Sequence, residues 1–240
     1  ELQSDVRYSI GAVRLKSEGP PAIYLASKQK LRFVGGATLE YVGGKNAILP
    51  SANSVLAIDL NYDFNPDLVV VGDGGLKVYQ QNDAGKFGDI TSRLGLPDAI
   101  LKSSFWGAWP LDVDLDGDQD VVLGSIDKAP LVLRNNGDGS FKDIQPFKGV
   151  TGLFSFASAD IDGDGTPDVA LIDGRNLLHV FLNKRLGQYL ELSLQKTGPL
   201  STVVAADINA DGDVDFVALK TDRTVLRISS GEMIDSLSVE

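Results

Sequence analysis

The sequence contains no cysteine, one histidine and one methionine among its 240 residues. Without cysteine the chain has no disulfide bond, no thiol chemistry and no cysteine-ligated zinc site. For the same reason, cysteine usage does not indicate whether the protein works in an oxidising or a reducing compartment. Because His179 is the only histidine, the composition disfavours catalysis or zinc binding that depends on histidine. No run of about 18 apolar residues occurs, so no segment is predicted to span a bilayer.

Positive charge is also scarce. The chain has 22 Lys and Arg against 33 Asp and Glu, which gives a formal net charge of −11. Such a charge argues against nucleic acid or an anionic membrane surface as a partner. The apolar content of 43% is enough for a full core. Because the chain begins at Glu1 with no signal-like segment, we expect it to be a piece of a longer protein.

The acidic residues gather in four stretches that align without a gap. They read DLNYDFNPD from Asp59, DVDLDGDQD from Asp112, DIDGDGTPD from Asp160 and DINADGDVD from Asp207. Their first residues lie 53, 48 and 47 positions apart, and each stretch is flanked by short apolar runs. Asp and Gly also collect at ordinary hairpin tips. Because the same acidic pattern occurs four times at nearly regular spacing, a repeated cation-binding loop is favoured over ordinary hairpin tips.

We name these stretches the Asp59, Asp112, Asp160 and Asp207 loops and number their positions 1 to 9. Positions 1, 3, 5 and 9 offer side-chain oxygens, position 7 typically adds a backbone carbonyl, and glycine at position 6 permits the sharp turn. Oxygen-only ligation suits calcium better than zinc or copper. We therefore expect three to four Ca²⁺ ions, with these candidate ligands: Asp59, Asn61, Asp63, Asn65, Asp67, Asp112, Asp114, Asp116, Asp118, Asp120, Asp160, Asp162, Asp164, Thr166, Asp168, Asp207, Asn209, Asp211, Asp213 and Asp215.

The four loops are not equivalent. Position 3 is an amide in the Asp59 and Asp207 loops, where Asn61 and Asn209 stand. The Asp59 loop also has Phe64 where the others have glycine. Its turn must therefore be made differently, with Asn65 as the candidate for the left-handed conformation, and we rank this site the weakest. The loops are not EF-hands, because position 12 lacks the required glutamate and strands flank each loop.

Short apolar runs separated by turn signals predict an all-β fold. Around the Asp160 loop we expect strands near 154–160, 168–172, 177–182 and 189–194. Four strands in about 48 residues match one blade of a β-propeller. We therefore predict a single domain, 1–240, that forms a closed propeller of five four-stranded antiparallel blades. The blades would lie near 5–50, 51–100, 101–150, 151–198 and 199–240, with a last strand around 233–239. The alternative is part of a larger propeller.

The first unit carries no acidic motif. RLKSEGPPA, from Arg14 to Ala22, aligns with the Asp160 loop without a gap and places Gly19 on Gly165. Arg14 and Lys16 then occupy two ligand positions, and Glu18 occupies a third. Two fixed positive charges would repel a cation, so we predict a metal-free loop. The alternative is an unrelated hairpin.

The acidic loops and the apolar strands after them resemble FG-GAP/VCBS calcium-binding propeller repeats. This family occurs in integrin α-subunit heads, bacterial surface proteins, some lectins and some polysaccharide lyases. The segments 54–96, GAWPLDVDLDGDQDVVLG (107–124) and RNNGDGSFKDI (134–144) look especially like bacterial members associated with ASPIC/UnbV-type domains. The resemblance implies a calcium-binding propeller and leaves the function open, because the scaffold is reused.

Two functions compete. A non-enzymatic module that binds another protein or domain fits the lack of a catalytic constellation. The alternative is glycan binding or polysaccharide-lyase chemistry, for which Trp106 and Trp109 are the candidate sugar contacts, with His179, Arg175 and Lys184 as the available bases and cations. Strand alternation places Trp109 in the core and Trp106 at a loop rim, and His179 reads as an ordinary blade residue. Calcium use and the family imply an extracytoplasmic location, as periplasmic, surface or secreted protein.

Overall fold

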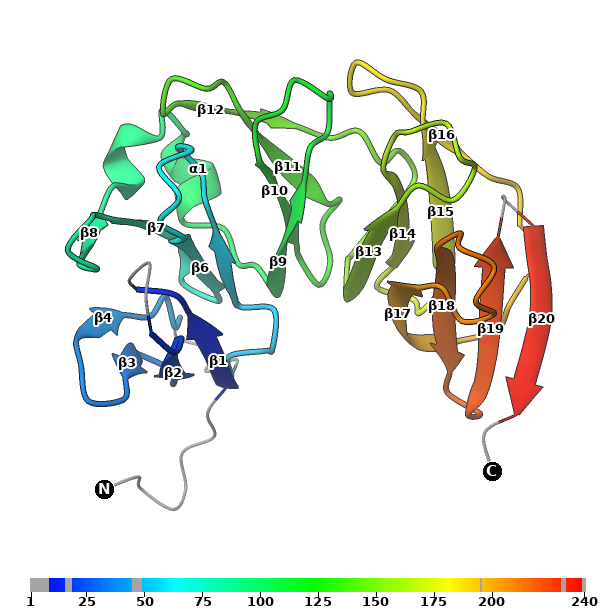
Figure 1. Cartoon of the computed structure of the whole chain (residues 1–240), viewed down its shortest axis with the longest axis horizontal. Coiled ribbons are helices and arrows are strands. Elements are labelled where there is room, and N and C mark those ends of the chain that lie inside the picture. Colours follow the sequence, from blue (N-terminus) through cyan, green and yellow to red (C-terminus); the bar gives the residue numbers. More distant parts are fainter. Residues whose placement is uncertain (1–8, 16–18, 45–48, 195, 230–231, 239–240) are drawn as a thin grey trace. The chain divides into compact units, whose positions relative to one another are not determined.

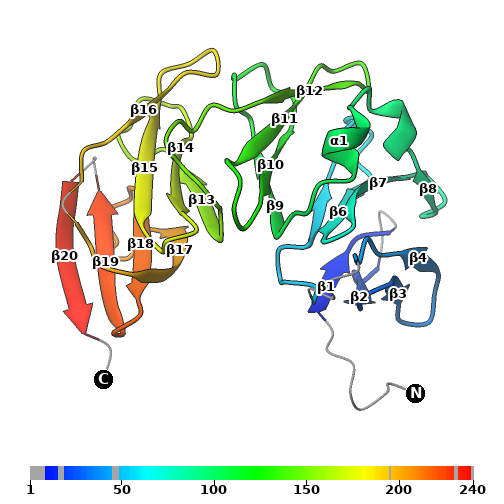
Figure 2. The same ribbon diagram turned by 180° about the vertical axis from the view of Figure 1, so that it is seen from behind.

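Five four-stranded sheets follow one another along the chain (Figure 1). The computed structural model describes the backbone of residues 9–15, 19–44, 49–194, 196–229 and 232–238, and the side chains among these up to residue 229. Within every sheet, hydrogen-bonded neighbours are also neighbours in sequence, so each sheet is a simple meander (Figure 2). The all-β prediction and the count of five units are confirmed.

The strands have the following bounds. The first sheet contains β1 (Ser9–Val13), β2 (Ala22–Ala26), β3 (Lys30–Phe33) and β4 (Thr38–Glu40). The second contains β5 (Val55–Ile58), β6 (Asp67–Gly72), β7 (Gly75–Gln81) and β8 (Phe87–Asp89). The third contains β9 (Gly107–Leu111), β10 (Asp120–Gly124), β11 (Leu131–Asn135) and β12 (Phe141–Ile144). The fourth contains β13 (Ser155–Ala159), β14 (Asp168–Ile172), β15 (Leu178–Asn183) and β16 (Tyr189–Glu191). The fifth contains β17 (Leu200–Ala206), β18 (Asp215–Lys220), β19 (Thr224–Ser229) and β20 (Glu232–Ser238).

The predicted strands of the fourth unit agree with β13 to β16, and the last predicted strand agrees with β20. β14 has the predicted bounds, whereas β16 ends at Glu191, three residues before the predicted end. Two short helices, η1 (Thr91–Arg93) and α1 (Asp98–Leu101), lie between β8 and β9. Neither helix was predicted, because a single helical turn is too short to show a helical period in the sequence. Among the described residues, no helix is long and apolar enough to cross a membrane.

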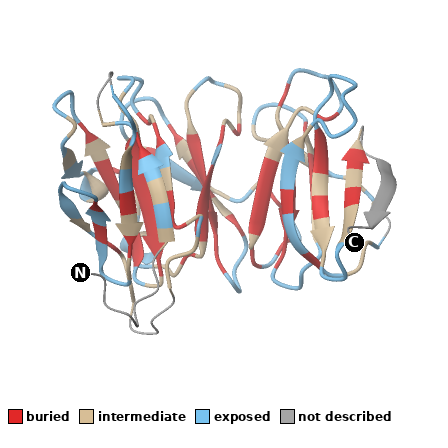
Figure 3. Cartoon of the chain, turned by 60° about the horizontal axis from the view of Figure 1, so that its bottom comes forward, coloured by how far each residue is buried: buried red, intermediate tan, exposed pale blue. Residues whose placement is uncertain are grey.

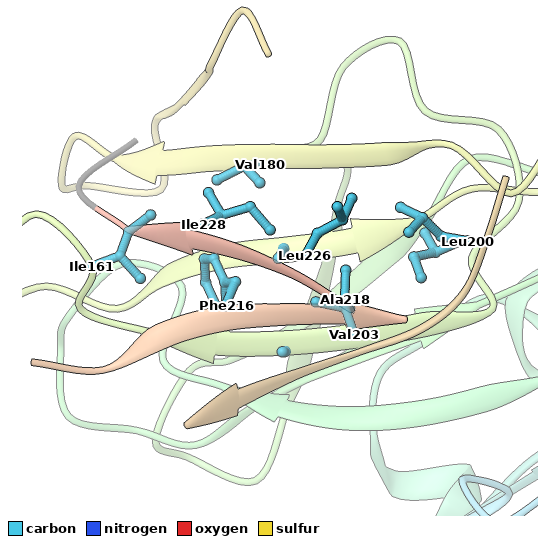
Figure 4. Packing of buried hydrophobic residues seen from close by; sticks show 11 residues of the cluster. Ile161, Val180, Leu200, Val203, Phe216, Ala218, Leu226 and Ile228 are labelled. Atoms are coloured by element: carbon cyan, nitrogen blue, oxygen red, sulfur yellow. The ribbon is translucent and has the colours of Figure 1, made fainter. Parts of the chain in front are cut away.

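The contacts divide the chain into two compact units, with the boundary inside the third sheet. One unit contains residues 1–110, 118–123 and 133–143, and the other contains 111–117, 124–132 and 144–240. In the first unit, Tyr24 and Phe33 of the first sheet share a buried cluster with Leu68 and Tyr79 of the second. In the second unit, the fourth and fifth sheets bury a comparable cluster that includes Val180, Phe216 and Ile228 (Figure 4). The core of each unit thus lies between successive sheets.

Burial follows the strands. β6, β10 and β14, the second strands of the middle three sheets, are buried at every position. The connecting loops are mostly exposed (Figure 3). Each acidic loop joins the first strand of a sheet to the second, and position 9, the first residue of that second strand, is buried in all four loops.

The strand register confirms the gapless alignment of the first unit. Val13 pairs with Ala22 across β1 and β2, as Ala159 pairs with Asp168 across β13 and β14. Arg14 therefore stands at position 1 of its loop and Ala22 at position 9. Gly19 has φ +97°, close to the +81° of Gly165 at the same position. The unrelated hairpin is thus wrong, and the predicted positions of Lys16 and Glu18 lie outside the described residues.

Candidate metal-binding loops

The carboxylate at position 1 holds each acidic loop in its turn. In the Asp160 loop, Oδ1 of Asp160 accepts the Gly163 N–H at 2.8 Å and Oδ2 accepts the Gly165 N–H at 2.9 Å. Asp112 accepts the N–H groups of Leu115 and Gly117 in the same way. The Asp207 loop repeats the pattern with Ala210 and Gly212. The first acid of the motif therefore folds the loop as well as offering oxygens to an ion.

The carboxylate at position 9 is a buried junction. Asp168 is fully buried, and its Oδ2 accepts the Ile161 N–H at 3.1 Å while its Oδ1 accepts the Asn183 N–H at 2.8 Å. Asp67 makes the equivalent pair of bonds with the N–H groups of Leu60 and Gln81. These bonds fix the last ligand position relative to the loop before any ion arrives.

Burial makes these carboxylates unfavourable places for negative charge. It raises the pKa of Asp67 to about 6, against the two backbone hydrogen bonds that lower it. It also raises the pKa of Asp168 and of Asp112, with smaller contributions from neighbouring acids. A desolvated carboxylate beside other carboxylates is stabilised by a bound cation. The electrostatics of the loops therefore fit a metal ion.

Two of the four loops bring three carboxylates together. In the Asp112 loop the oxygens of Asp112, Asp114 and Asp116 lie within 4.8 Å of one another. In the Asp160 loop the same is true of Asp160, Asp162 and Asp168. Oxygens at this separation fit around one ion with the 2.3–2.6 Å ligand distances of calcium. These loops are the strongest metal-site candidates among the described residues.

Amides at position 3 change the other two loops. Asn61 donates from Nδ2 to Oδ2 of Asp63 at 3.0 Å, and Asn209 donates likewise to Asp211 at 2.6 Å. Each amide therefore turns a donor toward the carboxylate at position 5, a group that a cation would need. Neither loop assembles a group of three carboxylates within the described part of the chain.

The remaining predicted ligands have other contacts. Asp164 at position 5 accepts a bond from the Thr166 hydroxyl at 2.6 Å, and this bond, with the backbone bond from Thr166, holds the pKa of Asp164 below its usual range. Asp120 is buried and accepts the Asn135 N–H at 2.7 Å. Oδ2 of buried Asp215 lies 3.6 Å from Nη1 of Arg227, so a side-chain cation already stands beside position 9 of the Asp207 loop. Of the other predicted ligands, Asp59 and Asp118 are half-buried, whereas Asp63, Asp207 and Asp213 are exposed.

The turn of the Asp59 loop corrects a prediction. Asn65 is not left-handed; the left-handed residues are Tyr62 at φ +57° and Phe64 at φ +65°. Positions 4 and 6 therefore keep the backbone conformation of Gly163 and Gly165, with φ +73° and +81°. The hydrogen bond from the Phe64 N–H to Oδ2 of Asp59, at 2.9 Å, enforces this conformation despite the aromatic side chain.

Three buried amides were missed by the sequence analysis. Gln81, Asn135 and Asn183 end the third strands of their sheets and donate their backbone N–H to the carboxylate at position 9. Their side chains donate again, to the carbonyl oxygens of Arg14, Leu60 and Pro167 respectively. The signal was present in three of the four loops, because a Gln or Asn follows position 9 of the Asp59, Asp112 and Asp160 loops by 14 or 15 residues.

The aromatic and basic candidates fall in different places. Trp109 is buried, as strand alternation predicted, and Trp106 is half-buried. Nδ1 of His179 lies 2.6 Å from Oε1 of Glu191, and its Nε2 lies 3.4 Å from Oδ2 of fully buried Asp173. Arg175 also binds Asp173, through Nε at 3.1 Å. His179 and Arg175 thus both contact the buried carboxylate of Asp173. Nζ of Lys184 lies 3.6 Å from Oδ2 of Asp162, in the Asp160 loop.

Comparison with protein families gives matches to the FG-GAP-like repeat over residues 112–171 and 160–218. Each match begins at position 1 of an acidic loop and ends in the second strand of the next sheet. Residues 112–218 thus match two overlapping FG-GAP-like repeats. The finer resemblance to ASPIC/UnbV-associated members is not confirmed by these matches, and no curated protein sequence matches the chain.

Solved structures share the fold of these FG-GAP repeats at low sequence identity. An Agrocybe aegerita lectin that recognises non-reducing terminal N-acetylglucosamine has a TM-score of 0.64 and 18% identity, over 98% of this chain and 67% of the lectin chain. BBS1N, solved in complex with ARL6DN, has a TM-score of 0.59 and 15% identity, over 97% of this chain and 67% of the BBS1N chain. The Dos1 propeller has a TM-score of 0.56 and 11% identity, over 91% of this chain and 56% of the Dos1 chain. These likenesses show a propeller-like fold.

Proposed function

We propose that the chain is a calcium-stabilised β-propeller module that binds another protein or domain and catalyses no reaction. The observation that carries the proposal is the convergence of three carboxylates in each of two FG-GAP loops, Asp112 to Asp116 and Asp160 to Asp168. These loops offer only oxygen ligands, which favours calcium. The ions act on the fold, because each loop connects two strands of one sheet.

The energetic effect of calcium follows from mass action. A site with a dissociation constant of about 10 μM, in about 1 mM calcium, adds about 2.7 kcal/mol to the free energy of unfolding. We propose that the Asp112 and Asp160 loops bind first, and that the Asp59 and Asp207 loops, with their amides, bind more weakly. Affinities in this range suit extracellular calcium, so we also propose an extracytoplasmic location, which fractionation of the native cells tests.

Thermal unfolding with and without calcium tests the metal. We expect a lower melting temperature in a chelator and full recovery when calcium is added in excess, with magnesium as the control ion. Isothermal titration of the chelated protein should give at least two sites. A melting curve that calcium leaves unchanged would reject the structural role of the ion.

The interaction role is supported by the scaffold. Rigid sheets hold long exposed loops, and a similar fold occurs in BBS1N, which was solved in complex with another protein. Chemical cross-linking in native cells, with calcium present, should give a discrete adduct between this chain and one protein. Only the monomer, with no adduct, would count against a protein-binding module.

We further propose that the five sheets close into one ring domain, with part of a larger propeller as the alternative. The support is an exposed apolar side chain on the first strand of the first sheet and another on the first strand of the fifth sheet. Ile10 of β1 is 69% exposed and Val204 of β17 is 51% exposed, both opposite the buried face of their sheet. Because the chain lacks cysteine, Ile10→Cys with Val204→Cys allows a clean test with bismaleimide cross-linkers. A closed ring predicts a fast intramolecular cross-link with short reagents, whereas further blades would separate the two thiols.

A second candidate function is glycan binding. It is favoured by the likeness to a lectin that recognises N-acetylglucosamine and by exposed aromatic side chains in the Asp59 loop. A glycan array probed with the calcium-loaded protein separates the two functions. Saturable binding to a saccharide would favour the glycan function, and a uniformly blank array would leave the protein-binding function.

A further inference from the structure

Phe64 presents an aromatic ring to solvent from a strained backbone position. Its side chain is 92% exposed, and its φ is +65°. The Asp112, Asp160 and Asp207 loops have glycine at this position, with φ between +73° and +98° for their loop glycines. A left-handed residue with a side chain costs roughly 1–2 kcal/mol, and Phe64 recovers none of this cost by burial.

The ring is not needed for the turn. The bond from the Phe64 N–H to Asp59 is a backbone bond, and glycine at position 6 makes the same bond in the Asp160 loop. Tyr62, two residues earlier, is also left-handed and is 50% exposed. Two strained, exposed aromatic residues on one loop indicate a role in contacting something outside the chain.

A concave site lies beside the ring. Its volume is about 610 Å³, and its apolar lining comes from Phe64, Pro66 and Ala84. This volume is in the usual range for small-ligand sites. The side chain of Asn65 bridges two parts of the lining, because its Nδ2 donates to Oδ1 of Asp83 at 3.2 Å. The polar lining is therefore held in place.

The polar lining mixes donors and acceptors. The lining includes one basic residue, Arg14, and two acidic residues, Asp63 and Asp83. A ligand that fits must offer hydroxyl groups, which both donate and accept, together with an apolar face for the ring. The two carboxylates and the net charge of −11 disfavour an anionic ligand.

We propose that this site binds a neutral pyranose sugar, stacked by its C–H face on Phe64 and hydrogen-bonded at its edge to Asp63, Asp83 and Arg14. The inference rests on the glycan-binding candidate function and assigns it a location that the tryptophans do not share. The Asp59 loop thus exchanges the glycine of its relatives for a ligand contact.

The test compares Phe64→Gly with the unmodified protein on an array of neutral oligosaccharides that end in N-acetylglucosamine, galactose or mannose. Oligogalacturonate serves as the charged probe. We expect a neutral saccharide to bind and Phe64→Gly to weaken this binding at least tenfold, with an equal or higher melting temperature because glycine relieves the strain. Phe64→Trp should retain binding.

Leu186→Ala is the matched control, because Leu186 is also exposed, at 82%, and left-handed, at φ +53°, but lies in the other unit. It should bind saccharide normally. Equal binding by Phe64→Gly and the unmodified protein would overturn this site and leave the glycan function standing. An array without any binding would reject both this site and the glycan-binding function. Binding of oligogalacturonate alone would show that the ligand is charged and overturn the neutral sugar. A protein partner whose binding is lost in Phe64→Gly would overturn the proposal that the ligand is a saccharide.

Discussion

Nδ2 of Asn135 donates a hydrogen bond to the carbonyl oxygen of Leu60, 2.9 Å away, across 75 residues of sequence. The bond joins the end of β11 in the third sheet to the acidic loop of the second sheet. Gln81 makes the corresponding bond from the second sheet to the carbonyl of Arg14, at 3.2 Å. A buried amide on a third strand therefore fastens each of these sheets to the loop of the sheet before it.

Asn135→Ala should lower the free energy of unfolding by about 1–3 kcal/mol, because it leaves buried carbonyl groups without their donor. Asn136→Ala is the matched control, since Asn136 is exposed and bonds only within its own hairpin. Urea unfolding followed by tryptophan fluorescence measures both variants. Similar losses for the two would show that the bond to Leu60 adds nothing.

Asp162→Asn should weaken calcium binding by the Asp160 loop without changing the shape of the side chain. It gives this loop the amide that the Asp59 and Asp207 loops have at position 3. The melting temperature should fall in calcium and stay nearly unchanged in chelator. Asp98→Asn, at an exposed acid outside the loops, should leave the calcium response intact, and an unaltered calcium titration of Asp162→Asn would remove Asp162 from the ligand set.

Gly165→Ala should destabilise the protein by about 1–2 kcal/mol through the backbone alone. Gly165 has φ +81°, and a Cβ added there would meet no atom within 4 Å. Gly88 has equally open space without a left-handed φ, so Gly88→Ala is the control and should be neutral or slightly stabilising. Thermal unfolding in chelator makes the comparison free of metal effects, and equal behaviour of the two variants would contradict it.

Asp173 should make stability depend on pH. Burial alone would raise the pKa of Asp173, but the N–H groups of Leu177 and Arg175 and the Arg175 guanidinium outweigh it and hold the pKa below its usual value. A carboxyl pKa that is lowered by folding gives stability that is fully present above the unfolded pKa, about 3.9, and is lost as the pH falls through the folded pKa.

Asp173→Asn should therefore be less stable than the unmodified protein above about pH 5, with a difference that shrinks as the solution becomes more acidic. Urea unfolding from pH 7 to pH 3 measures the difference. Asp127→Asn, at an exposed acid of the same unit, controls for general acid effects. A difference that is constant over the whole range would refute the lowered pKa.

The repeat, the strands and the register of the loops could all be predicted from the amino-acid sequence. The fourfold return of Asp at positions 1, 5 and 9 was enough to place five sheets, since strand alternation and turn residues are local signals. The same register carried over to the first unit, where Arg14 and Ala22 take positions 1 and 9. Local chemistry also separated the Asp112 and Asp160 loops from those with Asn61 and Asn209.

Tertiary structure alone decided what surrounds each loop. The side-chain amides of Gln81 and Asn135 reach loops of other sheets, so these contacts depend on how strands distant in sequence pack. Arg227 lies beside Asp215 on the neighbouring strand of the same sheet. The conformation of Phe64 was likewise decided in three dimensions. The bond from its N–H to Asp59 imposes a left-handed backbone conformation that a residue with a side chain disfavours. The intrinsic preference of phenylalanine is overridden because the turn is hydrogen-bonded and both of its ends are held by paired strands.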